Sequence, residues 1–421
     1  MRFATIAEWL AWQQVAHPVA IDPGLERAGE VWRRLALPRP RTVLTVGGTN
    51  GKGSVCAYLD AMLGAAGYDV GLFTSPHLVS YNERIRTGGR DADDAAIVAA
   101  FARIDAARGD ISLTFFEWST LAAFLLFAQE RVDVAVLEVG MGGRLDAVNL
   151  ADADVAAVVS VGLDHCEWLG GTIEEIGVEK AGIFRPGRPA IFGSRAMPES
   201  VARAAAACGA RLRRFRRDFD FVERADGWDY IGVGSRRREL PLPGLAGSAQ
   251  LANAVTALAV LEGAEPAVLV PDEAVRTGLK QVRLAGRFQV IGGEPEWILD
   301  VAHNPDAAQA LAASLAARPT RGRTIAVCGI LADKDIEGIV RPLAGGVERW
   351  IAVGLSGART LAAAELARRI ATVTGQAADI AVDVEAGMQA AQAICASGDR
   401  VLVFGSFLTV GPALACLGAA A

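Results

Sequence analysis

A glycine-rich segment that ends in a lysine and a serine carries the clearest chemistry in the chain. The β-branched run 42–46 is followed by GGTNGKGS at 47–54. Glycines allow backbone N–H groups to converge on phosphate oxygens, and the start of a helix adds positive potential. Lys52 can reach β- and γ-phosphates, and the Ser54 hydroxyl is a suitable Mg²⁺ ligand. The segment therefore predicts a nucleotide-binding loop, with Gly53 as an extra residue between the lysine and the serine of the generic pattern.

Two further polar side chains follow strand-like runs. Glu138 comes directly after the apolar run 134–137, and His165 follows the run 155–163. In open α/β sheets, ligands bind at the carboxyl ends of the strands. A carboxylate there is a hard oxygen ligand for Mg²⁺, whereas histidine is not a typical one. By residue chemistry alone, Glu138 is a metal-site candidate, and His165 is equally well explained as a structural hydrogen-bonding residue.

The elements that position these side chains are short strands that alternate with helices. Strand-like runs occur at 42–46, 132–137, 155–159, 324–327, 350–353 and 401–404. Strands alternating with helical stretches predict an α/β fold with parallel sheets. A glycine-rich stretch places the main boundary near 287–293, which gives domains at 1–288 and 289–421. The charge-dense segment 211–240 predicts a small antiparallel β insertion whose arginines lie on a solvated face.

Composition excludes several classes of protein. Among 421 residues, 42 Lys and Arg stand against 48 Asp and Glu, a net charge of −6, which argues against nucleic acid or an anionic membrane as the main partner. Six cysteines without metal-type spacing predict reduced thiols in a cytoplasmic protein. The segment 401–421 is uncharged, but Gly405 and Pro412 interrupt it, so we expect strand, loop and short helix rather than a membrane span. Since no zipper-like stretch occurs, we expect a monomer.

The loop GTNGKGS at 48–54 resembles the ATP-binding loop of the Mur ligase superfamily, in particular its folylpolyglutamate synthase/dihydrofolate synthase branch. Other segments resemble that branch in the same order: SPHL at 75–78, LEVGMGGRLDAVN at 137–149, LDH at 163–165, EKAGI at 179–183, ANAVTAL at 252–258, GRFQ at 286–289, DVAHNP at 300–305 and GSF at 405–407. The resemblance covers nearly the whole chain. It implies a P-loop ATPase domain with a parallel sheet, and a smaller Rossmann-like C-terminal glutamate ligase domain.

The resemblance also implies roles for individual residues. ATP contacts are expected from Thr49, Asn50, Gly51, Lys52, Gly53, Ser54, Asn253, Arg287 and Asp300. The Mg²⁺ ligands are expected to be Ser54, Ser75, Glu138 and His165, with K⁺ as a further cation. Lys180 is expected to be carbamylated and to act in catalysis with Lys52 and His303. His303 and Ser406 are placed near the phosphate or the incoming amino acid.

A second group of residues is expected to bind the acceptor. The segment IDPGLER at 21–27 resembles the IDLGLERV-like segment of the branch, with Pro23 as a departure. The expected acceptor contacts are Asp22, Gly24, Leu25, Thr114, Phe116, Glu117, Leu145, Asp146 and Ala147. A flat pterin requires an aromatic face and a carboxylate, which Phe116 and Asp146 could supply. Core packing is an equally good explanation of Phe116. Leu408 is a second departure, where relatives often have histidine.

The reaction implied by the resemblance is ATP-dependent glutamate ligation. ATP phosphorylates a carboxylate, the amine of L-glutamate attacks the acyl phosphate, and an amide, ADP and phosphate result. The expected acceptors are dihydropteroate, which gives dihydrofolate, and tetrahydrofolates, which gain γ-glutamyl residues.

Three alternatives remain: a monofunctional folylpolyglutamate synthase, another Mur-type acid–amino acid ligase, and a nucleotide-binding regulator without turnover. Only 46 residues precede the phosphate loop, which weighs against the additional domain of the cell-wall branch. The presence of Lys52, Ser54, Glu138, His165, Lys180 and Asp300 argues against a regulator.

Overall fold

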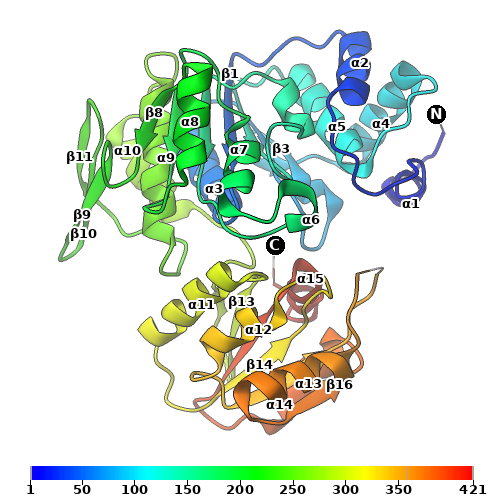
Figure 1. The fold of residues 1–421 in the computed structure, drawn as a ribbon, viewed down its shortest axis with the longest axis vertical. Coiled ribbons are helices and arrows are strands. Elements are labelled where there is room, and N and C mark those ends of the chain that lie inside the picture. Colours follow the sequence, from blue (N-terminus) through cyan, green and yellow to red (C-terminus); the bar gives the residue numbers. More distant parts are fainter. Residues whose placement is uncertain (1, 358, 420–421) are drawn as a thin grey trace. The chain divides into compact units, whose positions relative to one another are not determined.

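The computed structural model describes residues 2–357 and 359–419, which fold into two compact units (Figure 1). The first comprises the described residues of 1–76, 82–244 and 251–282. The second comprises 77–81, 245–250 and the described residues from 283 onward. Compared with the expected limits of 1–288 and 289–421, the second unit begins earlier and takes in two short segments. Local sequence cannot reveal these segments, because their assignment depends on contacts with residues far along the chain.

The described strands of the first unit form an eight-stranded sheet in the order β4-β3-β2-β5-β1-β6-β7-β8. The strands are β1 (Thr42–Gly47), β2 (Val70–Phe73), β3 (Ile85–Thr87), β4 (Arg90–Asp91), β5 (Val134–Glu138), β6 (Val155–Val158), β7 (Pro189–Phe192) and β8 (Arg211–Arg214). The run from β2 to β8 is parallel, and β3 and β4 are antiparallel. Buried parallel strands are rich in Val, Ile and Leu along their whole length, and every residue of β1 and β5 is buried. The predicted α/β fold is confirmed.

Helices precede and follow these strands. They are α1 (Ile6–Gln13), α2 (Glu26–Leu35), α3 (Lys52–Ala65), α4 (Asp94–Arg108), α5 (Phe115–Glu130), α6 (Cys166–Leu169), α7 (Ile173–Ala181), α8 (Glu199–Cys208), α9 (Gln250–Ala264) and α10 (Asp272–Gln281), with 3₁₀ turns η1 (Tyr81–Arg84) and η2 (Ala147–Leu150). Capping boxes at Thr5, Thr114 and Thr172 start α1, α5 and α7. Each box satisfies backbone N–H groups that have no partner within the helix.

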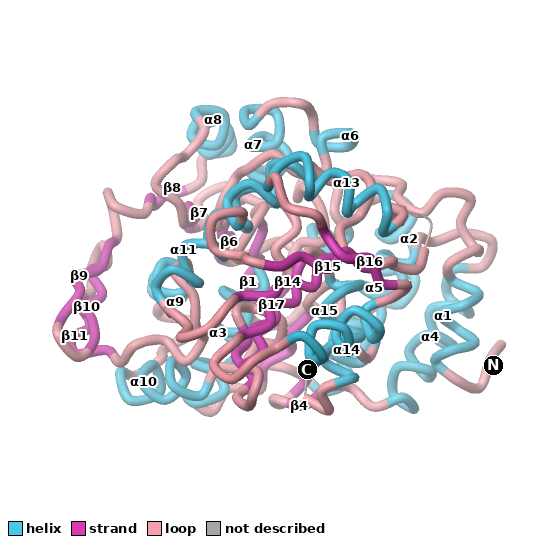
Figure 2. The backbone as a smooth tube through the Cα atoms, turned by 90° about the horizontal axis from the view of Figure 1, so that it is seen from below, coloured by secondary structure: helices cyan, strands magenta, loops and turns pink. Residues whose placement is uncertain are grey.

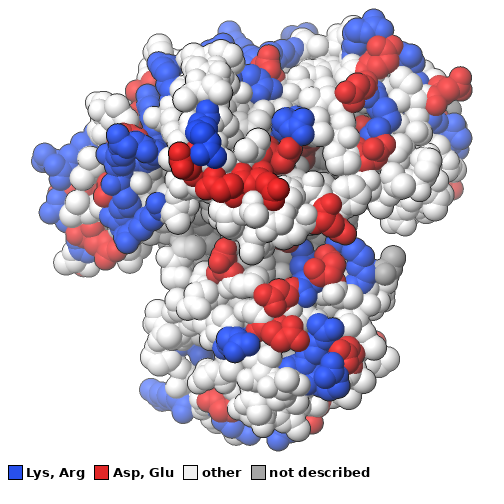
Figure 3. All heavy atoms as spheres, viewed as in Figure 1, with Lys and Arg blue, Asp and Glu red and all other residues white. Residues whose placement is uncertain are grey.

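A separate three-stranded antiparallel sheet contains β9 (Asp220–Arg224), β10 (Gly227–Ile231) and β11 (Arg236–Leu240) (Figure 2). The expected insertion at 211–240 therefore differs from the structure at its start, since Arg211–Arg214 pairs with β7 in the large sheet. Figure 3 shows the basic side chains of this region interspersed with acidic ones. Arg224 and Arg236 both pair with buried Asp229, at 2.5 and 3.1 Å, so part of this positive charge is neutralised locally.

The second unit has a six-stranded sheet in the order β12-β13-β17-β14-β15-β16 among its described residues. The strands are β12 (Gln289–Ile291), β13 (Glu296–Asp300), β14 (Thr324–Cys328), β15 (Arg349–Val353), β16 (Ala378–Ala381) and β17 (Arg400–Phe404). The helices are α11 (Pro305–Ala317), α12 (Ile336–Val340), α13 (Ala363–Thr374), α14 (Val384–Ile394) and α15 (Phe407–Cys416), with the 3₁₀ turn η3 (Arg341–Leu343). Among the described strands of this sheet, only β12 runs antiparallel to its neighbour.

Alternate residues along these strands belong to two apolar clusters. Ile298 and Leu402 pack in one cluster, and Leu299 and Val403 pack in the other. This alternation is the pattern of a sheet that is covered on both faces. The described part of the uncharged C-terminal segment, up to residue 419, forms β17, a loop and α15, as expected. Within the described part of the chain, no helix is long and apolar enough to cross a membrane.

Candidate functional site

The glycine-rich loop connects the end of β1 to the start of α3 and leaves little space around its backbone. Gly51 has φ +88°, and a Cβ atom there would lie 2.6 Å from the Asn253 side-chain oxygen, so only glycine fits. The Thr49 N–H donates to the Ser160 carbonyl at 2.8 Å, and the Asn50 N–H donates to the Ser160 hydroxyl at 2.9 Å. The segment after β6 therefore holds the loop in place, and Asn253 of α9 lies directly against it.

Lys52 and Ser54 lie in the first turn of α3. The Lys52 ammonium donates to the carbonyls of Gly48 and Thr49, at 3.1 and 3.3 Å, so it lies over the loop. Ser54 is buried. A helix start that carries a lysine and a buried hydroxyl fits a nucleotide phosphate with its metal ion. The expected phosphate-loop residues from Thr49 to Ser54 thus form one continuous structure.

Glu138 lies at the carboxyl end of β5, beside the phosphate loop. In the parallel register it is the partner of Val46, the residue before Gly47. Its side chain is buried and accepts a hydrogen bond from the Ser75 N–H at 3.1 Å. Two of the expected metal ligands, Ser75 and Glu138, are therefore neighbours although 63 residues separate them.

His165 is at the start of α6, in the left-handed conformation with φ +51°. Non-glycine residues in this region are uncommon and occur often at functional sites. Across the described residues, no group of three or more His, Cys, Asp and Glu side chains could hold a metal by itself. Of the expected ligands, only Glu138 and His165 are of these types. Mg²⁺ usually takes few protein ligands and completes its shell with water and phosphate oxygens, so the residue set fits such a site.

Lys180 lies in the last turn of α7 and is 4% exposed. Burial, together with the smaller effect of the positive charge of Lys52, lowers the pKa of Lys180 to about 7, although Asp164 and Asp146 oppose the shift. Near neutral pH, a substantial fraction of this amine is therefore uncharged. An uncharged amine is the form that reacts with CO₂ to give a carbamate.

The two expected pterin contacts, Phe116 and Asp146, meet at Gly140. A Cβ atom at Gly140 would lie 2.6 Å from the Phe116 ring and 3.3 Å from an Asp146 carboxylate oxygen. Asp146 accepts backbone N–H groups from Met141 and Val148, at 2.9 and 3.0 Å. Burial raises the pKa of Asp146 to about 6, against these hydrogen bonds. An aromatic ring and a carboxylate thus lie together on the loop after β5.

Thr114 and Glu117 form the capping box of α5. The Thr114 N–H donates to Glu117 at 2.7 Å, and the Glu117 N–H donates to the Thr114 hydroxyl at 3.3 Å. Glu117 is buried and pairs with Arg27 at 3.2 Å. Arg27 also pairs with Asp22 at 2.5 Å, and His17 contacts Asp22 at 3.1 Å. The expected contacts Asp22, Thr114 and Glu117 are therefore joined by one network.

Sequence reasoning missed Arg27 and His17 in this network. Arg27 lies in the first turn of α2, within the segment IDPGLER, but was given no role of its own. His17 lies outside every motif. The remaining acceptor candidates lie next to the residues already described. Gly24 and Leu25 precede α2, and Leu145 and Ala147 flank Asp146 at the start of η2.

The candidates of the second unit lie at the carboxyl ends of β13 and β17, which pair in parallel with Asp300 opposite Phe404. Asp300 accepts the N–H groups of Phe288 and Ala302, both at 2.8 Å. His303 Nδ1 lies 2.8 Å from the Val301 carbonyl. A carbonyl can only accept, so Nδ1 carries the proton and Nε2 holds the lone pair of the neutral ring. Buried Ser406 caps α15 by accepting the Leu408 N–H at 3.1 Å.

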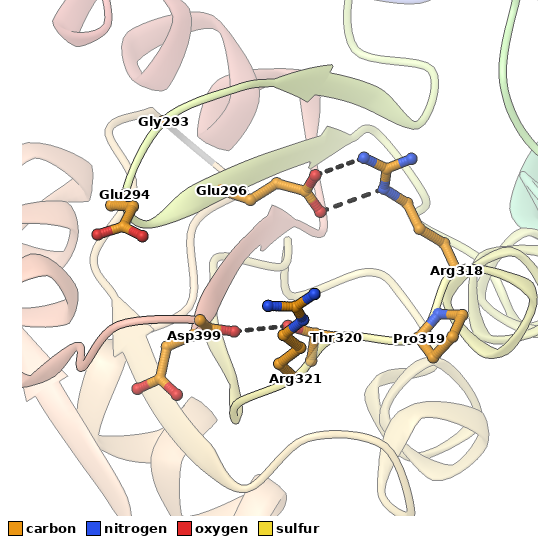
Figure 4. A pocket seen from close by; sticks show the side chains of 9 residues that line it. Gly293, Glu294, Glu296, Arg318, Pro319, Thr320, Arg321 and Asp399 are labelled. Atoms are coloured by element: carbon orange, nitrogen blue, oxygen red, sulfur yellow. Dashed lines mark hydrogen bonds and ion pairs between the residues drawn. The ribbon is translucent and has the colours of Figure 1, made fainter.

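A hollow of about 330 Å³ lies at the opposite edge of this sheet, where β13 and β17 begin (Figure 4). Its charged lining includes Glu296 and Arg318, which pair with each other at 2.5 Å. None of the predicted site residues lines this hollow.

Two family descriptions match the chain: the Mur ligase middle domain over residues 46–261, and the Mur ligase glutamate ligase domain over residues 286–407. The dihydrofolate synthase/folylpolyglutamate synthase of Escherichia coli strain K12 is 44% identical over 406 residues, which cover 96% of this chain and 94% of that relative. The Haemophilus influenzae protein of the same name is 38% identical over 428 residues, covering 96% of each chain.

Solved structures agree with these matches. The structure of E. coli FolC in complex with DHPP and ADP has a TM-score of 0.94 and 42% identity, covering 99% of this chain and 98% of that one. A bifunctional folylpolyglutamate synthase/dihydrofolate synthase with Mn, AMPPNP and L-glutamate bound has a TM-score of 0.91 and 44% identity over the same shares. Because the matches extend across both units and nearly the full length of the relatives, the chain belongs to the Mur ligase family, in its dihydrofolate synthase/folylpolyglutamate synthase branch.

Proposed function

We propose that this protein is a bifunctional ligase that uses ATP and a divalent metal ion to add L-glutamate to folate precursors. It joins glutamate to dihydropteroate, giving dihydrofolate, and extends tetrahydrofolates with γ-linked glutamates. The observation that carries the acceptor assignment is the meeting of Phe116 and Asp146 at Gly140, in the unit that holds the phosphate loop. The relative solved with DHPP and ADP, and the one solved with AMPPNP and L-glutamate, support the same substrates.

The phosphate loop binds and orients the nucleotide. Backbone N–H groups of residues 51–54 and the Lys52 ammonium hold the β- and γ-phosphates in line with the acceptor carboxylate. Ser54, Ser75, Glu138 and His165 are the proposed ligands of Mg²⁺, which neutralises the charge that develops on the transferring phosphoryl group. In the second unit, Arg287 and Asp300 are the proposed ATP contacts.

The acyl phosphate that results is a good leaving group for attack by an amine. The α-amine of glutamate must be uncharged to attack, and the Nε2 lone pair of His303 is suited to accept its proton. Ser406, at the start of α15, is the proposed contact of the incoming amino acid. Attack on the carbonyl carbon expels phosphate and leaves an amide.

Lys180 is proposed to carry a carbamate that contributes a negative charge to the metal site. Its burial and lowered pKa support this assignment. Carbon-13 NMR after incubation with labelled bicarbonate tests it directly. A carbamate signal that is absent from a Lys180→Arg variant is expected, and its absence from the wild type contradicts the modification.

Phosphate release from ATP, with Mg²⁺ and L-glutamate, tests the proposed activity. Three conditions are compared: dihydropteroate, tetrahydrofolate and no acceptor. Release with both acceptors and none without them is expected. Release with tetrahydrofolate alone would identify a monofunctional enzyme and overturn the pterin roles of Phe116 and Asp146. Folded, ATP-binding protein without acceptor-dependent release would refute the folate assignment.

A further inference from the structure

Phe407 contacts two of the candidate side chains of the second unit and has no assigned role. The Arg287 guanidinium carbon is 5.1 Å from the centroid of the Phe407 ring. The His303 ring centroid is 6.3 Å from the same centroid, with the planes inclined at 54°. Both separations are within the range of attractive cation–π and aromatic contacts. One phenyl ring therefore contacts both a guanidinium and an imidazole of the proposed site.

The position of Phe407 is determined by rigid backbone on both sides. It follows the end of β17 through Gly405, which has φ +115°, and a Cβ atom there would lie 2.5 Å from the Gly329 carbonyl oxygen. Ser406 then caps α15, of which Phe407 is the first residue. The ring is half-buried and packs against the apolar cluster on one face of the sheet. Because its backbone and one side of the ring are constrained, Phe407 offers a fixed surface to the side chains that contact it.

The backbone of Arg287 is also constrained, but its long side chain could place the guanidinium in several positions. Its neighbours Gly286 and Phe288 both have positive φ, at +67° and +45°. The Phe288 N–H donates to Asp300, and the Gly286 carbonyl accepts the Val301 N–H at 2.9 Å. These contacts determine where the side chain begins. The guanidinium at its far end donates to the Gly286 carbonyl at 3.2 Å and lies over the Phe407 ring.

We infer that Phe407 is a positioning residue that holds the Arg287 guanidinium, and beside it the His303 ring, in the orientation needed for phosphoryl transfer. It acts through these two residues and does not itself bind substrate. The inference rests on the proposed function for its kinetic consequences, but the contact itself can be tested without turnover.

The kinetic test replaces Phe407 with Leu, which keeps apolar packing but removes the aromatic face, and with Tyr, which keeps both. We expect Phe407→Leu to lower kcat/KM for ATP about tenfold, and Phe407→Tyr to remain within about twofold of the wild type. KM for the acceptor is expected to change less than twofold. In an Arg287→Ala background, Phe407→Leu is expected to add less than a twofold loss, because the partner is already absent. A full additional loss in that background would identify a merely structural role and overturn the inference.

A matched control is available in the small antiparallel sheet. Arg216 lies over the half-buried Phe221 ring, 4.4 Å from its centroid. Phe221→Leu removes the same kind of contact outside the proposed site and is expected to leave kcat/KM for ATP unchanged. An equal loss in Phe221→Leu would show that the kinetic effect at Phe407 is nonspecific, which contradicts the inference.

A second readout does not require catalysis. Because its guanidinium lies over the ring, the Arg287 side-chain Nε–Hε signal should be displaced by the ring current; its disappearance in Arg287→Lys assigns it. We expect the displacement to be lost in Phe407→Leu and kept in Phe407→Tyr. An unchanged signal in Phe407→Leu would overturn the contact. If instead the wild type shows no acceptor-dependent turnover, the proposed function fails, and this measurement still decides the role of Phe407.

Discussion

The Glu138 carboxylate accepts a hydrogen bond from the Ser75 N–H at 3.1 Å, which joins the end of β5 to the loop after β2. The same carboxylate lies next to the start of the phosphate loop, because β5 and β1 are parallel neighbours. One side chain therefore has two separable properties, a hydrogen bond that orders the loop and a charge that suits a metal ion.

Glu138→Gln separates these two properties. The amide oxygen can still accept the Ser75 N–H, but the negative charge is lost. We expect kcat to fall by roughly 100-fold and the Mg²⁺ concentration for half-maximal activity to rise at least about tenfold, with Tm nearly unchanged. Mg²⁺ titrations of phosphate release check this. Exposed Glu130→Gln on α5 is the control, and near-wild-type Mg²⁺ dependence in Glu138→Gln would exclude Glu138 as a ligand.

Gly140→Ala tests the acceptor site. The new methyl group would lie 2.6 Å from the Phe116 ring, so the ring must move. We expect KM for dihydropteroate to rise about tenfold and stability to fall by about 1–3 kcal/mol, with KM for ATP unchanged. Steady-state kinetics and urea unfolding measure these effects. Gly64→Ala on α3 is the matched control, since no atom lies within 4 Å of its Cβ position. An unchanged KM for dihydropteroate would contradict the placement of the pterin beside Phe116.

The lowered pKa of Lys180 predicts how its contribution to stability depends on pH. The folded-state pKa is about 7, against an ordinary value of 10.5. Between these values the unfolded state binds the proton and the folded state does not, so stability rises with pH in this window. We expect the difference in unfolding free energy between wild type and Lys180→Met to shift in favour of the wild type from pH 7 to pH 9. Urea unfolding in CO₂-free buffer measures it, and a difference that does not vary with pH would show that Lys180 is not desolvated.

Arg27→Met tests the buried end of the acceptor network. Glu117 is 4% exposed at its side chain and would lose its positive partner, while Arg27 itself is 25% exposed. Removing one member of a buried pair costs about 3–5 kcal/mol, and partial exposure here reduces the expectation to about 2–3 kcal/mol. Arg33→Met breaks the exposed pair with Glu30 and is expected to cost less than about 1 kcal/mol. Equal losses of unfolding free energy in the two variants, measured by urea unfolding, would show that the Arg27–Glu117 pair stabilises the fold no more than the exposed pair does.

Much of the fold and of the nucleotide site could be predicted from the sequence, because the relevant patterns are local. The phosphate loop is one strand, one glycine turn and one helix start, and each part constrains the next within 13 residues at 42–54. The apolar runs that form β1 and β5 predict parallel strands, and a carboxylate that ends such a run, as Glu138 does, must lie at the edge where ligands bind. Even the uncharged C-terminal segment was predictable, since Gly405 marks the end of its strand.

Other features were decided only by tertiary structure. The sequence 211–214 is as basic as the insertion that follows it, yet it joins the large sheet as β8, because pairing with β7 depends on distant backbone. Glu117 was expected to contact substrate, and that role stays a prediction. The structure adds that its oxygens are occupied by the start of α5 and by Arg27, which lies 90 residues away in the chain.

The sequence by itself determined the α/β fold and the phosphate loop, because each depends on periodicity or spacing within short stretches of chain. It also indicated the family, through motifs that resemble those of its branch along nearly the whole chain. Tertiary structure decided which side chains share a surface: Phe116 with Asp146 at Gly140, Arg27 with Glu117, and Arg287 with Phe407. Such contacts depend on how strands are ordered in a sheet and which way each helix faces. Those are properties of the packed core as a whole, and no local pattern encodes them.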